Sequence, residues 1–431
     1  MKNYVLVSVS DKTNILEFVN FLVEKGYYIL STGGTFRHIY ENLPEIRNKL
    51  EEVSEFTGFP EILGGRVKTL HPKIYGGLLW DDMFDIKDIT KIDMVVVNLY
   101  PFEDVIRKEN VKEEDAIENI DIGGVSLIRA SAKNYKNVSV VVDPSDYQSV
   151  MNSWDNLDSL NYRKKLAIKG FDMVTKYDAA ITNYFEKDIV FRRYEKQSDL
   201  KYGCNPYQNN AGIYKMNNVD LPFKVLSGNP GYINLLDAVN SWLLVSELER
   251  ITNKTAAASF KHTSPAGVAI SNGKFNENER KIYDIENYDL SKSPSGEAFV
   301  KARNCDPLSS FGDFISISGT VDEPCARLIS REVSDGIIAG GFTSMALEIL
   351  KKKKNGKFII LEGNRNFDYQ DIEFRELNGF GLSQRANNEV LTRDELDNIV
   401  TQNKEITEEV KDDLILATIT LKYTPSNSIT I

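Results

Sequence analysis

The sequence has few cysteines and few histidines, and both shortages exclude kinds of site. Its three cysteines, Cys204, Cys305 and Cys325, are odd in number and widely spaced, which argues against a disulfide scaffold and a structural zinc site. None of the three histidines stands at a spacing typical of metal ligands. We therefore expect no catalytic transition metal, and a reducing compartment.

An excess of basic charge and long apolar runs are also lacking. The 52 Lys and Arg residues against 63 Asp and Glu give a net charge of −11, which argues against binding to nucleic acid or anionic membranes. No run approaches the ~18 apolar residues of a membrane span, and the first nine residues do not resemble a signal peptide. We expect a soluble, cytoplasmic protein without nucleic-acid or membrane partners, although a few local cations could still bind an anionic substrate.

What is present indicates an α/β protein of more than one domain. The chain has 431 residues with 42% hydrophobic and 27% charged residues, as in globular proteins of two or three domains. Apolar strands separated by helices in the first 150 residues predict a parallel sheet covered on both faces. The predicted strands there span residues 4–9, 27–30, 94–99 and 138–142. Ligands of such sheets bind at the carboxyl ends of the strands.

A long helix over residues 159–187 is predicted to connect the two parts. Its expected apolar stripe is Ala167, Phe171, Val174, Ile181 and Phe185. We place the domains at residues 1–196 and 197–431. The second part mixes predicted helices at 235–251 and 328–336 with predicted strands at 256–260, 314–319 and 358–362, a polar surface insertion at 271–295, and a strand-like segment at 414–423.

Three turns of the first part share glycines, hydroxyls and cations, a composition suited to phosphate. They are Ser10-Asp11-Lys12, Ser31-Thr32-Gly33-Gly34-Thr35 and Gly64-Gly65-Arg66-Val67-Lys68-Thr69. Glycines let backbone N–H groups approach an anion, and the cations add charge at a helix N-terminus. Together the turns predict a phosphate pocket.

Other residues have two interpretations from the sequence alone. Lys133 follows Asp121-Ile122-Gly123-Gly124 on a predicted helix, and is either a solvated surface charge or a proton shuttle. Tyr100 ends a buried strand as a core aromatic or as a hydroxyl donor into the pocket. His262 follows Lys261 at a strand end, where it is either structural or a general base.

These segments, taken together and in order, resemble the bifunctional family of purine biosynthesis that joins AICAR transformylase and IMP cyclohydrolase. The resemblance covers nearly the whole chain. Its most specific markers are residues 64–72, 98–102, 120–124, 261–267, 309–314 and 334–339. The family implies a methylglyoxal-synthase-like N-terminal domain and a cytidine-deaminase-like transformylase domain, in a homodimer.

For the N-terminal domain, the resemblance implies dehydrative ring closure of FAICAR to IMP. It gives Lys133 the role of proton donor and acceptor, with Tyr100 and Asp121 beside the reacting atoms. The implied substrate-binding residues are Ser10, Asp11, Lys12, Thr32, Gly33, Gly34, Thr35, Arg66, Val67, Lys68, Thr69, Val97, Asn98, Ile122 and Gly123.

For the second domain, the resemblance implies formyl transfer from 10-formyltetrahydrofolate, as co-substrate, to AICAR. His262 is then the base and Lys261 stabilises charge on the formyl oxygen. The implied AICAR-binding residues are Lys201, Tyr202, Gly312, Asp335 and Asn427.

Some residues depart from the family pattern. Lys201 replaces an Arg whose bidentate fork Lys cannot supply, Tyr207 replaces a His, and Gly340 replaces a Pro. The sequence also ends at Ile431, where family members continue with further substrate contacts. Three interpretations follow: a bifunctional enzyme, a cyclohydrolase with an incomplete transformylase region that transfers formyl groups poorly, or a non-catalytic nucleotide-binding homologue. The intact N-terminal motifs argue against the third.

Overall fold

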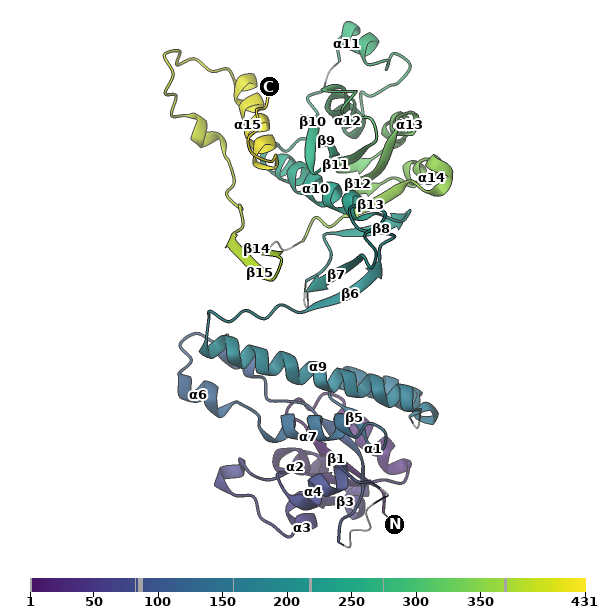
Figure 1. Ribbon diagram of the computed structural model, residues 1–431, viewed down its shortest axis with the longest axis vertical. Helices are drawn as coiled ribbons and strands as arrows, with labels where there is room; N and C mark the ends of the chain where they lie inside the picture. Colours follow the sequence, from purple (N-terminus) through teal and green to yellow (C-terminus); the bar gives the residue numbers. More distant parts are fainter. Residues whose placement is uncertain are drawn as a thin grey trace. The chain divides into compact units, whose positions relative to one another are not determined.

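The computed structural model describes residues 2–81, 83, 88–157, 159–216, 219–273, 275–367 and 370–431 (Figure 1). The chain forms two compact units, the first ending at Phe191 and the second running from Arg192 to Ile431. The division falls between residues 191 and 192, whereas the sequence places the domain boundary between 196 and 197. Each unit has its own sheet and its own core, so each is described by itself.

The first unit is built on a five-stranded parallel sheet in the order β3-β2-β1-β4-β5. Its strands are β1 (Tyr4–Ser8), β2 (Tyr28–Ser31), β3 (Leu50–Glu52), β4 (Ile92–Val97) and β5 (Ser139–Val141). Its helices are α1 (Ile15–Glu24), α2 (Gly33–Asn42), α3 (Val53–Thr57), α4 (Pro72–Leu78), α5 (Phe102–Ile106), α6 (Glu113–Glu118), α7 (Gly123–Lys133), α8 (Tyr147–Asn152) and α9 (Leu160–Phe185). Short 3₁₀ turns span Pro44–Lys49, Leu63–Gly65, Pro144–Asp146 and Trp154–Asn156.

Both faces of this sheet are buried, which confirms the predicted covered parallel sheet. Along β1, Val5 and Val7 face a core that includes α1 and α8, whereas Tyr4 and Leu6 face a core that includes α4, α7 and α9. Because successive side chains of a strand point to opposite faces, a strand buried on both sides has to be apolar throughout. The sheet is therefore a rigid base for the loops at its carboxyl edge.

The predicted stripe of the long helix is partly wrong. The residues of α9 that are buried are Leu166, Ala167, Gly170, Val174 and Tyr177. Phe171 is 38% exposed and Phe185 is 49% exposed. The helix packs closely on α7 at Gly170, where a Cβ would lie 3.1 Å from Ile128 Cγ2, and this close approach sets which face is buried.

The second unit contains a six-stranded mixed sheet in the order β10-β9-β11-β12-β13-β8, and two separate hairpins, β6–β7 and β14–β15. Its strands are β6 (Tyr194–Asp199), β7 (Gly212–Met216), β8 (Phe223–Ser227), β9 (Ala256–Lys261), β10 (Ser264–Ile270), β11 (Asp313–Val321), β12 (Ser334–Phe342), β13 (Ile359–Gly363), β14 (Ile372–Leu377) and β15 (Phe380–Arg385). Its helices are α10 (Tyr232–Thr252), α11 (Glu277–Ile282), α12 (Pro294–Asn304), α13 (Glu323–Arg331), α14 (Ser344–Lys352) and α15 (Glu408–Lys422), with 3₁₀ turns at Lys353–Gly356 and Arg393–Leu396. Helices α10 and α15 pack on one face of the large sheet, and α12, α13 and α14 on the other.

Two predicted elements of this unit are wrong. The helix predicted at 328–336 is shifted, because the Asp322 side chain caps α13 by accepting from Cys325 N, and Ser334 already begins β12 beside β11. The strand-like segment 414–423 belongs to helix α15, which buries Ile415 and Ile419 one turn apart. That segment is therefore not an open sheet edge. In the described part of the chain, no helix combines the length and apolarity needed to cross a membrane.

Candidate functional sites

The first two predicted turns meet at the carboxyl edge of the parallel sheet. Ser8 Oγ, at the end of β1, lies 3.0 Å from Thr32 Oγ1, at the end of β2. Thr35 Oγ1 donates to the carbonyl oxygen of Val9 at 3.0 Å and so ties the first turn of α2 to β1. No side chain among the described residues caps α2, which begins at Gly33. Its first N–H groups and its dipole are therefore directed at this edge, as an anion site needs.

The third turn folds over the same helix start. A Cβ built on Gly33, whose φ is 41°, would lie 3.4 Å from Glu61 Oε1 and 3.9 Å from Lys68 Nζ. A Cβ on Gly65 would lie 3.5 Å from the other carboxylate oxygen of Glu61. The structure thus brings Lys68 to the α2 N-terminus, together with a carboxylate that the sequence analysis did not single out.

Arg66 and Val67 are placed differently from Lys68. The exposed guanidinium of Arg66 forms an ion pair with Glu118, with Nε 3.2 Å from Glu118 Oε1. Val67 makes an isolated antiparallel bridge with Ile62, which closes the loop. In this structure Arg66 therefore faces solvent and Glu118 rather than the α2 N-terminus.

Asn98 shapes the first turn through hydrogen bonds to its backbone. Its Oδ1 accepts from the backbone N–H of Ser10 at 2.6 Å and of Asp11 at 2.9 Å, and its Nδ2 donates to the carbonyl oxygen of Asp11 at 2.9 Å. Val97, the buried last residue of β4, fixes where Asn98 stands. The Asp11 carboxylate accepts from Thr13 N and Oγ1, and these bonds lower the pKa of Asp11. Asn98 is thus a positioning residue.

Lys12 completes the first turn. Its Nζ lies 3.5 Å from the carbonyl oxygen of Ser10, at the limit of a hydrogen bond, and this ammonium has no other hydrogen bond or ion pair to the described residues. Thr69, from the third turn, is buried, and its Oγ1 would lie 3.0 Å from a Cβ on Gly123 at the start of α7. Neighbouring Ile122 is exposed.

Asp121 is the carboxylate at the centre of this edge. Its Oδ1 accepts from Gly124 N at 2.7 Å, and the backbone N–H of Tyr100 also donates to it. Burial raises the pKa of Asp121, while these two N–H groups and the charge of Lys68 oppose the rise. A raised pKa makes a carboxyl more able to carry a proton than an ordinary aspartate at the same pH. The Tyr100 side chain is 41% exposed, which favours the hydroxyl-donor interpretation over a core aromatic.

Two tyrosines that the sequence analysis did not single out lie beside Asp121. Tyr177 Oη accepts from Asp121 N at 2.7 Å and donates to Asn119 O at 3.0 Å, and so fixes the loop before α7. Tyr75 Oη is enclosed near Asp121 and Ser126 and has no well-formed hydrogen bond to a described residue. Burial raises the pKa of Tyr75 to about 12. Both tyrosines lie in helices, where the sequence pattern indicates only apolar packing.

The structure does not bring Lys133 to this group. Lys133 is the exposed last residue of α7, whose N-terminus lies at Asp121 and Gly124. Ten residues of helix separate Gly123 from Lys133, or about 15 Å at 1.5 Å per residue. The chain then enters β5, whose beginning lies at the opposite edge of the parallel sheet. The role that the resemblance gives to Lys133 therefore stays a prediction.

In the second unit, Lys261 and His262 lie at one end of the mixed sheet. Lys261 ends β9, and its Nζ donates to Phe311 O at 2.9 Å, next to Gly312. His262 is exposed in the two-residue loop between β9 and β10. Asp335 is near the start of β12, which lies beyond β11 in the sheet, and forms an ion pair with Lys354 at 2.7 Å. Four of the predicted transformylase residues therefore share this end of the sheet.

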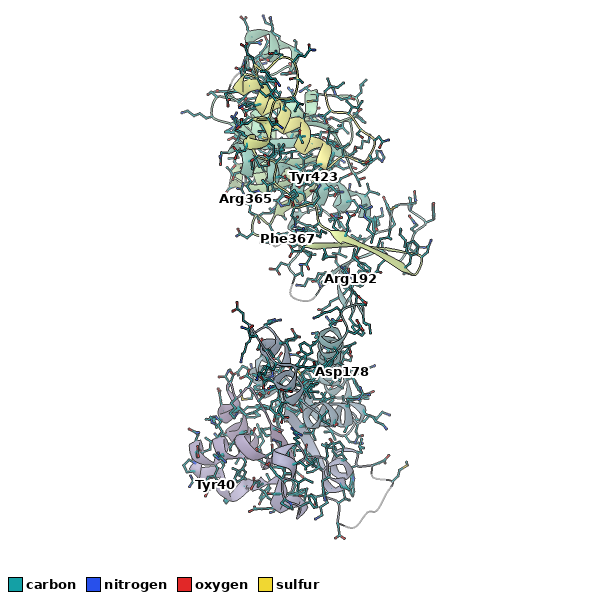
Figure 2. All side chains as sticks on the ribbon, turned by 90° about the vertical axis from the view of Figure 1, so that its left-hand side faces the viewer. Tyr40, Asp178, Arg192, Arg365, Phe367 and Tyr423 are labelled. Carbon is teal, nitrogen blue, oxygen red and sulfur yellow. The ribbon has the colours of Figure 1, made fainter. Side chains whose placement is uncertain are left out.

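Lys201, Tyr202 and Asn427 come from other segments. Lys201 lies in the loop between β6 and β7, with its Nζ 5.7 Å from the centre of the Tyr202 ring. Asn427 is exposed in the segment that follows α15, after Tyr423 (Figure 2). Its neighbour Ser426 and Thr263 both line a cavity of about 1650 Å³. Within the described residues, no hydrogen bond joins Lys201 to His262.

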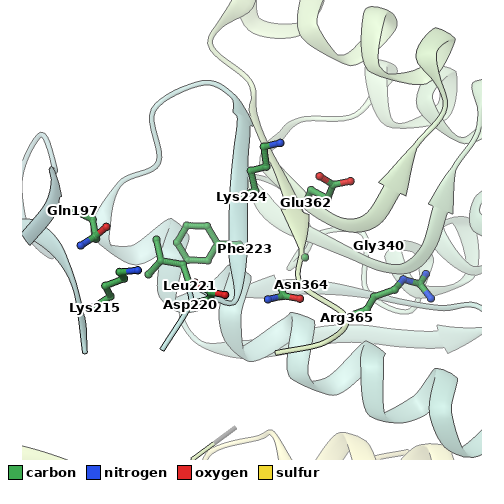
Figure 3. Close-up of a pocket in the computed structure, with 11 residues that line it drawn as sticks. Gln197, Lys215, Asp220, Leu221, Phe223, Lys224, Gly340, Glu362, Asn364 and Arg365 are labelled. Carbon is green, nitrogen blue, oxygen red and sulfur yellow. The ribbon is translucent and has the colours of Figure 1, made fainter. Parts of the chain in front are cut away.

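A smaller cavity that the sequence did not predict lies at the other end of the sheet. It has a volume of about 590 Å³, and Figure 3 shows Lys215, Lys224, Glu362 and Arg365 around it. Arg365 also pairs with Glu249 at 3.1 Å. No group of three or more His, Cys, Asp or Glu side chains in the described ranges is arranged to hold a metal ion.

Comparison with known proteins finds two family models that match consecutive parts of the chain. The MGS-like domain matches residues 14–126, and the AICARFT/IMPCHase bienzyme matches residues 131–431. A solved structure entitled "Crystal structure of ForH" is 28% identical over 43% of this chain and 100% of its own, with a TM-score of 0.38.

Similar curated proteins extend over nearly the whole chain. The bifunctional purine biosynthesis protein PurH of Clostridium acetobutylicum is 38% identical over 99% of this chain and 81% of its own length. PurH of Leptospira biflexa is 38% identical over 98% and 80%, and PurH of Clostridium botulinum is 36% identical over 99% and 81%. The chain thus spans about four-fifths of these relatives. With a bienzyme model over most of its length and these relatives over nearly all of it, the chain belongs to the AICARFT/IMPCHase bienzyme family.

Proposed function

We propose that the protein catalyses both reactions of its family in purine biosynthesis. In the first, AICAR receives a formyl group from 10-formyltetrahydrofolate and becomes FAICAR; in the second, FAICAR loses water and closes to IMP. The observation that carries the proposal is the grouping of an anion-binding edge with Asp121 in one unit and of Lys261 with His262 in the other. A cyclohydrolase alone is not favoured, because the bienzyme model extends to residue 431.

Ring closure fits the first unit. The phosphate of FAICAR would bind to the N-terminus of α2 and to Lys12 and Lys68, where backbone N–H groups and ammonium charge converge. The carboxamide nitrogen attacks the formyl carbon, so the site must accept a proton from nitrogen and protonate the oxygen that leaves as water. Asp121 supplies a carboxyl with a raised pKa for this transfer, and Tyr100 supplies a hydroxyl.

Formyl transfer fits the exposed end of the second sheet. The AICAR amine attacks the formyl carbon, His262 accepts the amine proton, and Lys261 stabilises the negative charge on the formyl oxygen. The bond from the formyl carbon to the folate nitrogen then breaks, and that nitrogen takes up a proton. Gly312 and Asp335 share this end and would orient AICAR, with Lys201, Tyr202 and Asn427 as further contacts that the resemblance implies.

The resemblance to the family also implies an oligomeric state and a location for the protein. We propose that the protein is a homodimer and that it acts in the cytoplasm. Sedimentation equilibrium tests the first: a mass of twice 48.8 kDa is expected, and a monomer at every concentration would contradict it.

The experiment compares the two half-reactions on the same protein. The full chain is supplied with FAICAR in one assay, and with AICAR and 10-formyltetrahydrofolate in the other. His262→Ala should abolish formyl transfer and leave cyclisation within about twofold, whereas Asp121→Asn should do the reverse, with losses of ~10²–10⁴-fold in each case. Wild-type protein that closes the ring but transfers no formyl group would restrict the function to cyclohydrolase.

A further inference from the structure

The turn that carries His262 has a backbone conformation that its own residues do not favour. Lys261 pairs with Ser264, and the two residues between them, His262 and Thr263, have φ of 56° and 60°. Positive φ at both central residues of a two-residue hairpin loop is the type I′ turn, which favours Asn-Gly. Threonine is β-branched, so a positive φ is uncommon and unfavourable for it. Something outside the turn has to hold it.

A buried carboxylate on the helix beneath provides that support. Asp237 of α10 is 5% exposed, and its Oδ1 accepts from the backbone N–H of Thr263 at 2.6 Å. In a type I′ turn the backbone bond of the turn uses the N–H of the fourth residue, here Ser264, which leaves the N–H of Thr263 for this contact. A hydrogen bond that a backbone N–H donates to a carboxylate is among the stronger hydrogen bonds.

Burial raises the pKa of Asp237, and the hydrogen bond that its carboxylate accepts from the N–H of Thr263 opposes this rise. The nearby His262 also lowers the pKa, whereas Asp335 of β12 and Asp313 of β11 raise it further. These two acids already have partners, Lys354 for Asp335 and Arg303 for Asp313.

We infer that Asp237 is a positioning residue for formyl transfer: through the N–H of Thr263 it holds the turn so that His262 is presented at the end of the sheet. The inference rests on the proposed function for the role of His262. It also gives a role to one of the two buried acids of α10; the other, Glu247, is held by Lys422 and Tyr423.

Kinetics of the full chain test the inference. Asp237→Ala should lower kcat for formyl transfer at least ~10-fold, because a small misplacement of a reacting group is costly, with the KM for AICAR within about twofold. Asp237→Asn keeps an oxygen acceptor for Thr263 N–H and should recover kcat to within about threefold of wild type. Cyclisation should stay unchanged in both variants.

Two further variants separate positioning from general damage. Glu297 is the matched control, since it is also buried and accepts from backbone N–H groups, those of Asn272 and Gly273 at 2.9 Å, but lies on α12 across the sheet. Glu297→Ala should leave the kcat of formyl transfer within about twofold. Adding Thr263→Gly to Asp237→Ala should recover part of the lost kcat, because glycine adopts positive φ without strain.

Any of three results would overturn the inference. The first is a wild-type kcat in Asp237→Ala, the second is an Asp237→Asn variant as impaired as Asp237→Ala, and the third is a double variant in which Thr263→Gly recovers no kcat. If the wild-type chain transfers no formyl group, the proposed function fails. Hydrogen exchange at the Thr263 amide then tests separately whether Asp237 holds the turn. Asp237→Ala should accelerate exchange at that amide and not along β9. An unchanged rate at Thr263 would overturn the positioning role.

Discussion

Replacing Arg303 by methionine should destabilise the second unit, because the buried carboxylate of Asp313 then loses its cationic partner. Arg303 Nη1 lies 2.9 Å from Asp313 Oδ1, and the two side chains are 7% and 0% exposed. Asp313 also accepts from Ser259 Oγ at 2.6 Å, and Arg303 Nε lies 3.1 Å from Glu332. Removing one partner of a buried pair leaves an uncompensated charge, which costs about 3–5 kcal/mol of the free energy of unfolding.

The pH dependence of this loss has a definite sign. Burial raises the pKa of Asp313, and the charge of Arg303 opposes the rise. In Arg303→Met the pKa should rise further, so the folded chain takes up a proton before the unfolded chain does as the pH falls. The stability deficit of the variant should therefore be smaller at pH 5 than at pH 8.

The measurement needs a probe of the second unit alone. The chain has three tryptophans, and only Trp242, which is buried on α10, belongs to that unit. Urea unfolding followed by fluorescence in a Trp80→Phe/Trp154→Phe background therefore reports on it. A loss below about 1 kcal/mol at pH 8, or an equal loss at pH 5 and pH 8, would refute the reasoning.

Three further predictions concern ring closure. Lys68→Ala should lower the kcat/KM of cyclisation ~10²-fold or more, because Lys68 lies at the α2 N-terminus and beside Asp121; a rate within threefold of wild type would contradict this. In Lys133→Ala the kcat/KM of cyclisation should stay within about threefold of wild type, because the helix places Lys133 some 15 Å from Gly123. A ~10²-fold loss of kcat/KM in this variant would instead support the role implied by the resemblance. Tyr75→Phe removes an enclosed hydroxyl that has no well-formed hydrogen bond to the described residues, so the free energy of unfolding should change by no more than about 1 kcal/mol. Because this hydroxyl lies near Asp121, the pH profile of cyclisation should shift, and an unchanged profile would exclude Tyr75 from the site.

The sequence by itself determined the elements whose signals are local. The apolar strands of the first unit could be predicted because burial on both faces demands apolar residues along the whole strand, as Val5, Leu6 and Val7 show. The turn over residues 31–35 could be predicted because its glycines and hydroxyls are typical of a turn that follows a strand. That Gly33 and Asn98 lie at one edge also follows, because they come after β2 and β4 and parallel strands place their carboxyl ends together.

Tertiary structure alone decided which of the candidate residues meet. Nothing local distinguishes Lys68, whose charge acts on Asp121, from Arg66, which pairs with Glu118, because the choice depends on how the loop folds over α2. Segment 414–423 was predicted as a strand, since a short apolar run does not separate strand from helix until it is known which face packs on α10.

The residues that hold functional turns in place could not be predicted from the sequence, for the same reason. Asn98 accepts a hydrogen bond from the backbone of a turn 87 residues away, and Asp237 accepts one from a turn 26 residues away. No local sequence pattern encodes such a pairing. Local patterns fix the conformation of a segment through its own side chains and solvent. The placement of Lys133 at the far end of α7, and of Asp237 beneath His262, depends on contacts between segments that come together only when the sheets are packed.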